Sequence, residues 1–556
     1  SDIDTAVKRN FGGFFGEFNP ASTFLSEVKS IHQGPNETSV MSIELLKSAL
    51  NYSSKEKTDS RYLLIITKNN AALNILQMEK LLEKKVEILF GSSFPGDQEY
   101  TSICNNINRI KIFMETGKQV VLVNLESLYE SLYDCLNQSY SWMGGNRYVD
   151  LGLGTHRVKC KVHPDFRLIV VAEDKDVLNR FPIPLINRLE KHYLGMETIL
   201  PPEFSQLVSR LKQWMKVFCK VDIPAYRESR YKQKSERDVF IGYHEDAIPA
   251  MILDMEKEGM TLEEYEEGCI ARLIQCATPD GIMRLPNSEL DDKFEELFTQ
   301  YFVDQNHDSL ASYLTSLDHQ KTNLVEITTH SKLLTSAAVN EMTPRLQHAV
   351  SISLEFLQQF SSEEDFRKAL NKFVEKVGKS PQKCNLICQL DAGEPTSRNL
   401  LESARYIIRG IINEVNTLRV PPVFDIIIIL HIPFGSGDYI GYPVTPWRSV
   451  HIDELRCQHG LQPMMIKRMR GRSVTNIIKT EANDDIGIVP LSQLVESVVP
   501  KAVSMIKGGA PERSVERIDR FLGLLRKNEI FQKITHQKVV RLLEIKDQQS
   551  ENVMEK

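Results

Sequence analysis

The feature that most constrains the fold of this chain is an alternation of short, continuous apolar runs with amphipathic stretches, which starts twice along the sequence. In the first half the apolar runs are residues 61–67, 86–90, 119–123 and 166–172. Helical spacing connects them at residues 70–76, at Ile107, Ile110 and Met114, and at Leu125, Leu128, Leu132 and Leu136. Continuous apolar runs are typical of parallel strands buried on both faces, so this half is predicted to be a parallel sheet covered by helices.

The second half repeats the order after a stretch of different character. Residues 200–320 show helical periodicity and high charge without convincing strands, which predicts a helical lid. Apolar runs resume at residues 324–328, 385–389, 424–430 and 447–452, with an amphipathic helix at 400–415 and helical sequence after 455. The predicted fold class is therefore α/β, with two mainly parallel sheet layers, each followed by a helical lid.

Composition excludes several classes of protein. A length of 556 residues corresponds to about three or four domains, and a net charge of −6 gives no electrostatic case for nucleic acid as a partner. No apolar run reaches the ~18 residues of a membrane span, because the longest candidate, 420–434, contains prolines and Asp425. The first residue is Ser1 rather than Met, so we expect a fragment of a longer polypeptide.

The nine cysteines form no C-x-x-C pair, so the sequence signals neither a zinc site nor a disulfide framework. Cys384 and Cys388 lie four residues apart in a strand-like run, where alternation places both thiols on one face. We interpret them as small core residues.

The chain lacks a phosphate-binding loop, since no G-x-x-x-x-G-K-[ST] pattern occurs in it. The first apolar run is followed by Thr67-Lys-Asn-Asn-Ala-Ala72, in which no glycine is present and Lys68 precedes any loop. The corresponding segment of the second half, Thr329-His-Ser-Lys-Leu333, has the same defect. Both segments are interpreted as plain strand-to-helix turns.

The acids that hold Mg²⁺ and orient water in an active ATPase are also missing from their expected positions. They should follow the third strand, but residues 119–123 are followed by Asn124 and Leu125. In the second half we assign the same position to Leu430-His-Ile432, again without acids. We therefore predict that neither centre hydrolyses nucleotide.

Three other segments could bind anions and are interpreted more simply. The glycines of 152–157 precede a strand, and those of 435–441 are followed by prolines, so both are expected to be turns. The basic run 467–472 is interpreted as a solvated face.

Arginine is the remaining chemical signal. In residues 166–193 a buried strand and an acidic connector lead to Pro182 and Pro184 and then to a helix opening on Leu185-Ile-Asn-Arg188. The prolines hold the entry rigid, as an arginine acting on a neighbouring subunit's nucleotide requires. Arg188 is the candidate for such a trans-acting finger and Arg180 competes with it. The alternative is an ion pair of Arg188 with Glu190 or with the acidic connector 173–176.

Three long segments, 118–134, 148–160 and 181–193, closely resemble the mysterin family of giant ubiquitin ligases, and the resemblance extends through the whole chain. Members of this family carry a dynein-like AAA+ core and a RING domain. The resemblance implies one chain with six AAA+ units in a ring, of which only the middle ones bind and hydrolyse ATP. Arg188 would be presented by unit five to the ATP of unit four.

The resemblance also implies an organisation of the chain. Its segments would be 1–58, the end of the preceding lid; 59–199 and 200–320, the sheet layer and lid of unit five; 321–455, the sheet layer of unit six; and 456–556, a helical lid or connector to the ligase half.

For the parent protein the resemblance implies RING-type ubiquitin transfer, with ATP, Mg²⁺ and zinc as cofactors and with ubiquitin and a ubiquitin-conjugating enzyme as partners. The segment itself would contact adjacent AAA+ units and hold no cofactor or metal. The family is cytosolic, associates with lipid droplets and acts in immunity. Two alternatives stay open: a stand-alone protein-interaction module of AAA+ ancestry, and a degenerate unit that binds nucleotide without hydrolysing it.

Overall fold

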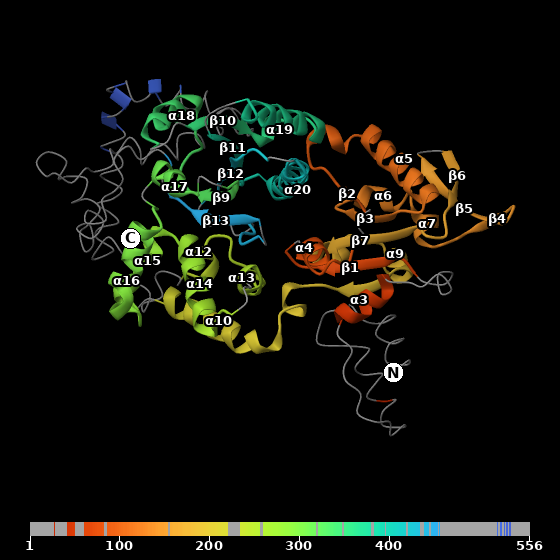
Figure 1. Cartoon of the computed structure of the whole chain (residues 1–556), viewed down its shortest axis with the longest axis horizontal. Helices are drawn as coiled ribbons and strands as arrows, with labels where there is room; N and C mark the ends of the chain where they lie inside the picture. Colours follow the sequence, from red (N-terminus) through yellow and green to blue (C-terminus); the bar gives the residue numbers. More distant parts are fainter. Residues whose placement is uncertain are drawn as a thin grey trace, which may run out of the picture. The chain divides into compact units, whose positions relative to one another are not determined.

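The computed structural model (Figure 1) describes residues 42–50 and 61–455, with Glu27 and a few positions between 520 and 537. The gaps within 61–455 are residues 70, 83–85, 154–155, 221–233, 256–258, 308, 319–320, 347–349, 380–382, 395, 419–420, 434–438, 444–445 and 454. The basic run 467–472, residues 435–438 and nearly all of 1–58 and 456–556 therefore lie outside the described residues. Internal contacts define two compact units, the first made of residues 1–204, 360–367 and 399–410 and the second of the remainder.

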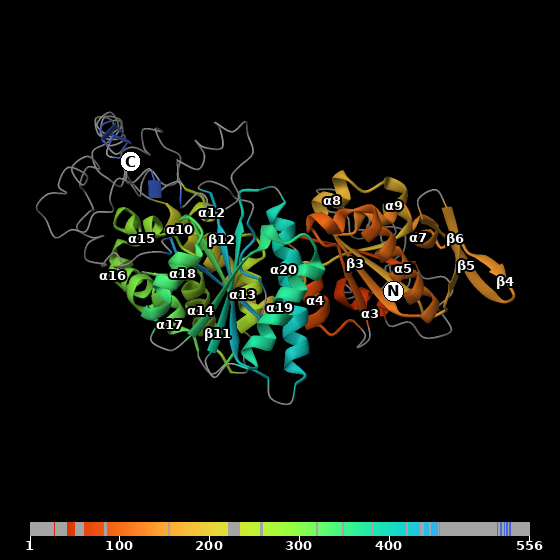
Figure 2. The same ribbon diagram turned by 90° about the horizontal axis from the view of Figure 1, so that it is seen from above.

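The first unit is built on a sheet of five parallel strands in the order β2-β3-β7-β1-β8. Figure 1 labels β1, β2, β3 and β7, and Figure 2 shows the same sheet from above. The strands are β1 (Leu63–Thr67), β2 (Glu87–Phe90), β3 (Gln119–Val123), β7 (Arg167–Glu173) and β8 (Glu190–Tyr193). Four of them coincide with the predicted apolar runs, and the parallel arrangement is confirmed. All residues of β1 and β3 are buried, as expected for strands covered on both faces.

Helices connect these strands as the alternation predicts. They are α4 (Ala71–Met78), α5 (Tyr100–Thr116), α6 (Glu126–Tyr129), α7 (Tyr133–Leu136), α8 (Asp174–Asn179) and α9 (Ile183–Arg188), with α3 (Ser42–Leu50) before the sheet. The helix α5 ends at Thr116 and is capped by Gly117, whose φ of +73° is left-handed and whose N–H donates to the carbonyl of Phe113. The predicted leucine stripe is buried, but it spans two short helices rather than one.

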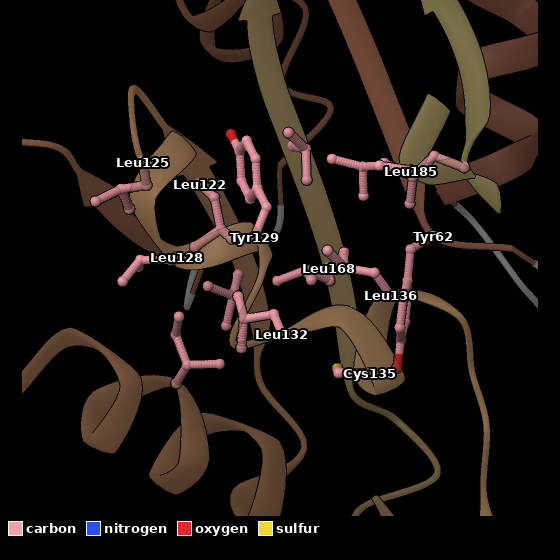
Figure 3. Packing of buried hydrophobic residues seen from close by; sticks show 14 of the residues in the cluster. Tyr62, Leu122, Leu125, Leu128, Tyr129, Leu132, Cys135, Leu136, Leu168 and Leu185 are labelled. Carbon is pink, nitrogen blue, oxygen red and sulfur yellow. The ribbon is translucent and has the colours of Figure 1, made fainter. Parts of the chain in front are cut away.

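The core of the first unit lies between the sheet and this stripe, as Figure 3 shows. Leu128 and Leu132 are fully buried beside Leu122 of β3 and Leu168 of β7. At one end of the cluster Tyr62 packs edge-on against Phe166, and its hydroxyl forms a 2.9 Å hydrogen bond with that of Tyr140. The stripe therefore closes one face of the sheet through apolar contact.

Two features of the first unit differ from the sequence-based prediction. A small antiparallel sheet, β4 (Ser141–Met143), β5 (Asn146–Leu153) and β6 (His156–Val162), occupies a stretch where one turn was expected. The helix predicted to open on Leu185 begins at Ile183 and ends at Arg188, after which the chain forms β8. The helix stops there because β8 pairs with β1, in register from Leu63 opposite Glu190.

The second unit contains a second parallel sheet in the order β10-β11-β12-β9-β13. Its strands are β9 (Asn323–Thr329), β10 (Val350–Phe356), β11 (Lys383–Asp391), β12 (Phe424–His431) and β13 (Trp447–His451). Numbered along the chain, the strands of both sheets follow the same order, 2-3-4-1-5. In the sequence, the two halves of the chain matched only in the order of their elements. The structure shows that their sheets also share one topology.

Along the chain from β8 to β9, the regular secondary structure of the described residues is helical, apart from an isolated bridge between Phe240 and Ala277. These helices are α10 (Ser205–Cys219), α12 (Glu236–Val239), α13 (Ala247–Met255), α14 (Leu262–Gln275), α15 (Pro279–Met283), α16 (Phe294–Thr299) and α17 (Leu310–Ser316). Thr261 and Glu264 form a capping box at the start of α14. The helices of the second sheet are α18 (Ser336–Met342), α19 (Glu363–Val377) and α20 (Ser397–Asn416).

Strand β10 and helix α19 were not predicted, and β10 changes the assignment of the strands that follow. The predicted strand at 385–389 is the third of its sheet, and the run 424–430 is the fourth. Among the described residues, no helix is both long and apolar enough to cross a membrane.

Leu132→Ala should destabilise the first unit locally. The side chain is fully buried, and removing such a group costs about 2–5 kcal/mol. Hydrogen–deuterium exchange of the whole chain should show faster exchange in β3 and β7. Leu178→Ala is the matched control, because Leu178 on α8 is 70% exposed. Equal effects of the two variants would contradict the assignment of the core.

Candidate functional site

The turn after the first strand of the first sheet is where a nucleotide-binding unit would hold phosphate, and here its N–H groups bind protein. Asn69 N–H donates to Glu173 Oε2 at 3.1 Å, and Ala71 N–H donates to the carbonyl of Lys68 at 3.1 Å. Ala72 N–H donates to Thr67 Oγ1 at 3.0 Å. The helix N-terminus therefore offers a triphosphate few donors, and the Glu173 carboxylate would repel it.

The corresponding turn of the second sheet is closed by a different side chain. Gln389 on β11 accepts a hydrogen bond from Leu334 N–H at 2.6 Å and donates one to the Leu334 carbonyl at 2.8 Å. Thr335 caps α18 by accepting from Ala338 N–H. Both contacts use backbone N–H groups, which in a phosphate-binding loop would donate to the phosphate.

The end of the third strand in the first sheet is covered by backbone. Asn124 has a left-handed φ of +54°, and Leu125 is buried in the core. Gly91 N–H donates to the carbonyl of Val123 at 2.7 Å, and a Cβ added at Gly91 would lie 1.7 Å from the Asn124 carbonyl oxygen. Only glycine allows this close approach of the two backbone segments.

The corresponding assignment in the second sheet was wrong. The third strand is β11, and it ends at Asp391, whereas His431 and Ile432 follow the fourth strand. An acid is therefore present where the sequence predicted none. The error arose because β10 was missed and β12 was counted as the third strand.

Asp391 is already engaged by protein groups. His431 Nδ1–H donates to Asp391 Oδ1 at 3.1 Å, and Gly393 N–H donates to the same oxygen at 3.0 Å. Burial raises the pKa of the Asp391 carboxyl, but the contacts with His431 and Gly393 outweigh burial and hold the pKa below its ordinary value. The carboxylate is ionised and oriented toward His431.

Arg188 is the last residue of α9 and lies against an aromatic ring. Its guanidinium carbon is 4.0 Å from the centroid of Tyr133, and Nη2 donates to the Tyr133 hydroxyl. Nη1 is buried and has no hydrogen-bond partner among the described residues. Cation–π contact holds an arginine without neutralising its charge, so Arg188 keeps its full charge and an unused donor.

Both ends of α9 are restrained. Pro182 caps its start with φ −62° and ψ 134°. At its end the ammonium group of Lys191 on β8 donates to the carbonyls of Ile186 and Leu189 at 3.2 and 3.4 Å. Burial, with the charge of Arg61, lowers the pKa of Lys191 although Glu190 opposes the shift. Lys191 thus stabilises the last turn of the helix that carries Arg188.

Arg180 has a different environment. Its side chain is 70% exposed and forms an i,i+4 ion pair with Asp176 at 3.3 Å. The pairing with the acidic connector that was considered for Arg188 is therefore made by Arg180. Glu190, the other partner considered, accepts from His192 Nε2 at 3.0 Å.

Cys384 and Cys388 are both fully buried on β11, as the core interpretation predicts. Burial raises the pKa of the Cys388 thiol, which keeps it protonated and unreactive. Two glycine-rich segments were expected to be turns. The first begins inside a strand, since Gly152 lies within β5. In the second, Gly441 is described, whereas Gly435 lies outside the described residues.

Together these features define a class. Two sheets of identical parallel topology, each with a helix after its first strand and functional positions at one edge, are AAA-type α/β units.

Comparison with known proteins identifies the family. Residues 52–200 and 311–458 each match a family model described as "RNF213 AAA domain", the fifth and sixth of that protein, which is also called mysterin. The chain belongs to this family, which confirms the resemblance noted from the sequence.

Three relatives are described as E3 ubiquitin-protein ligases. The chain is 40% identical to mouse RNF213 over 506 residues, covering 86% of this chain and 10% of that protein. Identity to human RNF213 is 41% over 485 residues, 82% of this chain and 9% of that protein. Identity to zebrafish rnf213-beta is 32% over 656 residues, 94% of this chain and 13% of that protein. The chain thus spans roughly a tenth of the length of these relatives.

Lys191→Met should loosen α9. The variant leaves two carbonyls without their donor, and an unsatisfied buried group costs about 1–3 kcal/mol. Hydrogen–deuterium exchange should become faster in 183–189 while β3 is unaffected. Lys175→Met, at an exposed position on α8, is the control and should leave both segments unchanged. Unchanged protection of 183–189 in Lys191→Met would contradict the restraining role.

Proposed function

We propose that this chain is a non-hydrolysing scaffold within the AAA+ core of a giant ATP-dependent E3 ubiquitin ligase, and that it promotes ATP hydrolysis in a neighbouring unit. The observation that carries the first part is the use of the N–H groups after β1 and β9 by protein acceptors. The relatives' description as E3 ubiquitin-protein ligases supports its place within such a ligase.

The same proposal gives the chain its place in the larger protein. Residues 59–199 with 200–320 would correspond to the fifth AAA+ unit of the family and 321–455 to the sheet layer of the sixth, between the preceding lid, 1–58, and the segment 456–556 that leads to the ligase half. By internal contacts, residues 205–320 group with the second sheet. In this proposal the parent protein binds ATP, Mg²⁺ and the zinc of its RING domain outside this chain, together with ubiquitin and its conjugating enzyme. By family resemblance the protein acts in the cytosol and at lipid droplets.

Arg188 is the residue proposed to act on the neighbouring nucleotide. An arginine finger stabilises the negative charge that develops on the γ-phosphate, so it needs an uncompensated charge, available donors and a fixed position. Stacking on Tyr133 supplies the first. Nη1 is buried and has no hydrogen-bond partner within the described part of the chain, so it is the donor that a rotation of the side chain would present. The restraints on α9 supply the third.

Arg188→Ala in the full-length protein should lower ATP turnover by ~10³-fold or more, because fingers of this kind contribute that much to the rate. Steady-state ATPase assays measure it directly. Arg188→Lys should be nearly as impaired, since lysine lacks the planar fork. Arg180→Ala is the matched control and should retain turnover. Tyr133→Phe keeps the ring and should retain more activity than Tyr133→Leu.

The competing function is a stand-alone protein-interaction module of AAA+ ancestry. In that case Arg188→Ala would leave turnover at the level of the Arg180→Ala control. Such a result would remove the trans-activating role and leave only the scaffold.

A titration of the 556-residue chain with Mg·ATP tests the scaffold role separately. We expect no hydrolysis and a Kd weaker than ~1 mM, because the turn N–H groups are engaged. Isothermal titration calorimetry and phosphate release are the measurements, with a nucleotide-binding unit of the longer protein as positive control. Micromolar binding without hydrolysis would show that a degenerate unit retains nucleotide, and hydrolysis would overturn the proposal.

A further inference from the structure

Two histidines and an aspartate meet at the carboxyl edge of the second sheet. His330 directly follows β9, His451 ends β13, and Asp453 lies two residues later. Because β9 and β13 pair in parallel with Thr328 opposite His451, residues more than a hundred positions apart become neighbours. One potential ligand atom from each residue lies within 4.8 Å of the others, and the two imidazole centroids are 5.0 Å apart.

Hydrogen bonds set the tautomers of both imidazoles. His330 Nδ1–H donates to the carbonyl of Ile432 at 2.7 Å. The Thr328 hydroxyl donates to the carbonyl of Val450, so it must accept from His451 Nδ1–H, 3.0 Å away. In both rings the proton is therefore on Nδ1 and the lone pair is on Nε2. A histidine that binds metal almost always donates its other ring N–H to an oxygen in this way.

His451 supplies an independent indication of a ligand. Its side chain is fully buried, and Nε2 has no hydrogen-bond partner among the described residues. The nearest carboxylate oxygen, Asp453 Oδ1, is 3.9 Å away, beyond hydrogen-bond distance. A buried lone pair without a donor is unfavourable, and a cation between these groups would satisfy it.

We propose that His330, His451 and Asp453 bind a divalent transition-metal ion of the zinc class, with one coordination position left to water. Two imidazoles and one carboxylate are a ligand set that zinc accepts, and ligands around tetrahedral zinc are roughly 3.4 Å apart. The Asp453 side chain is 47% exposed, so it can rotate to close the remaining distance and leaves a path for the ion.

The metal site would join the turn after β9, the first strand of the second sheet, to the end of β13, its fifth strand. In a nucleotide-binding unit that turn carries the phosphate loop, so the ion would brace an edge whose phosphate-binding groups are absent. The inference departs from the sequence-based expectation that this segment holds no metal. It does not depend on the proposed action of Arg188, which lies in the other unit.

The test is metal titration of the chelator-treated 556-residue chain, with Zn²⁺ by calorimetry and Co²⁺ by visible absorption. We expect one ion per chain and a Co²⁺ spectrum without thiolate charge-transfer bands, which excludes the cysteines as ligands. His330→Asn and Asp453→Asn should each weaken binding by ~100-fold or more, and Thr328→Val, which frees the His451 ring, by ~10–100-fold.

His431→Asn is the matched control, because His431 pairs with Asp391 at the same edge and belongs to another cluster. It should bind Zn²⁺ like the native chain. Circular dichroism of each metal-free variant confirms folding before titration. Absence of stoichiometric binding by the native chain would overturn the proposal. So would native affinity in both His330→Asn and Asp453→Asn, or an equal loss in His431→Asn.

Discussion

The parallel pairing of each first strand with the fourth and fifth strands is the constraint on which the rest of this structure depends. β1 lies between β7 and β8, and β9 lies between β12 and β13. Because these strands run parallel, their carboxyl ends share one edge, which the N–H groups of the next helix face. Glu173 and Gln389 use those groups to hold the turns in place. The geometry that could bind phosphate is thus used for internal hydrogen bonding.

The two edges share topology but differ in chemistry. In the first unit the third strand ends at Val123, and Gly91 N–H donates to the Val123 carbonyl. In the second unit the third strand ends in Asp391, and His330 and His451 lie at the same edge. At the first edge the Glu173 carboxylate accepts from the turn, whereas the second edge also presents two imidazoles beside a carboxylate, a ligand set for a transition metal. The two proposals differ accordingly: an arginine that acts on a neighbouring nucleotide in the first unit, and a cation site in the second.

How much could be predicted from the sequence depended on where each segment's stabilising contacts lie. β1, β3 and β12 are continuous apolar runs, so burial on both faces was visible in the sequence. β8 reads Glu-Lys-His-Tyr and was missed, because it is polar in sequence and its buried polar groups are satisfied by specific partners, such as the carbonyl of Ile186 for Lys191. β10 alternates small polar and apolar residues, and missing it misplaced the third strand. The His330–His451 cluster has no local spacing that a motif search could find.

The candidate finger illustrates the same limit, since Arg188 and Arg180 are alike in sequence and differ only in what surrounds them. Arg180 is exposed and paired with Asp176, and solvent screens what charge remains. Arg188 stacks on Tyr133, a residue 55 positions away, and keeps an unused donor. Lys191 lies on β8, which pairs with β1, and its ammonium group donates to the last turn of α9. A finger that acts on a neighbouring nucleotide needs a fixed position, so the edge strand of the sheet would contribute to the proposed role of Arg188.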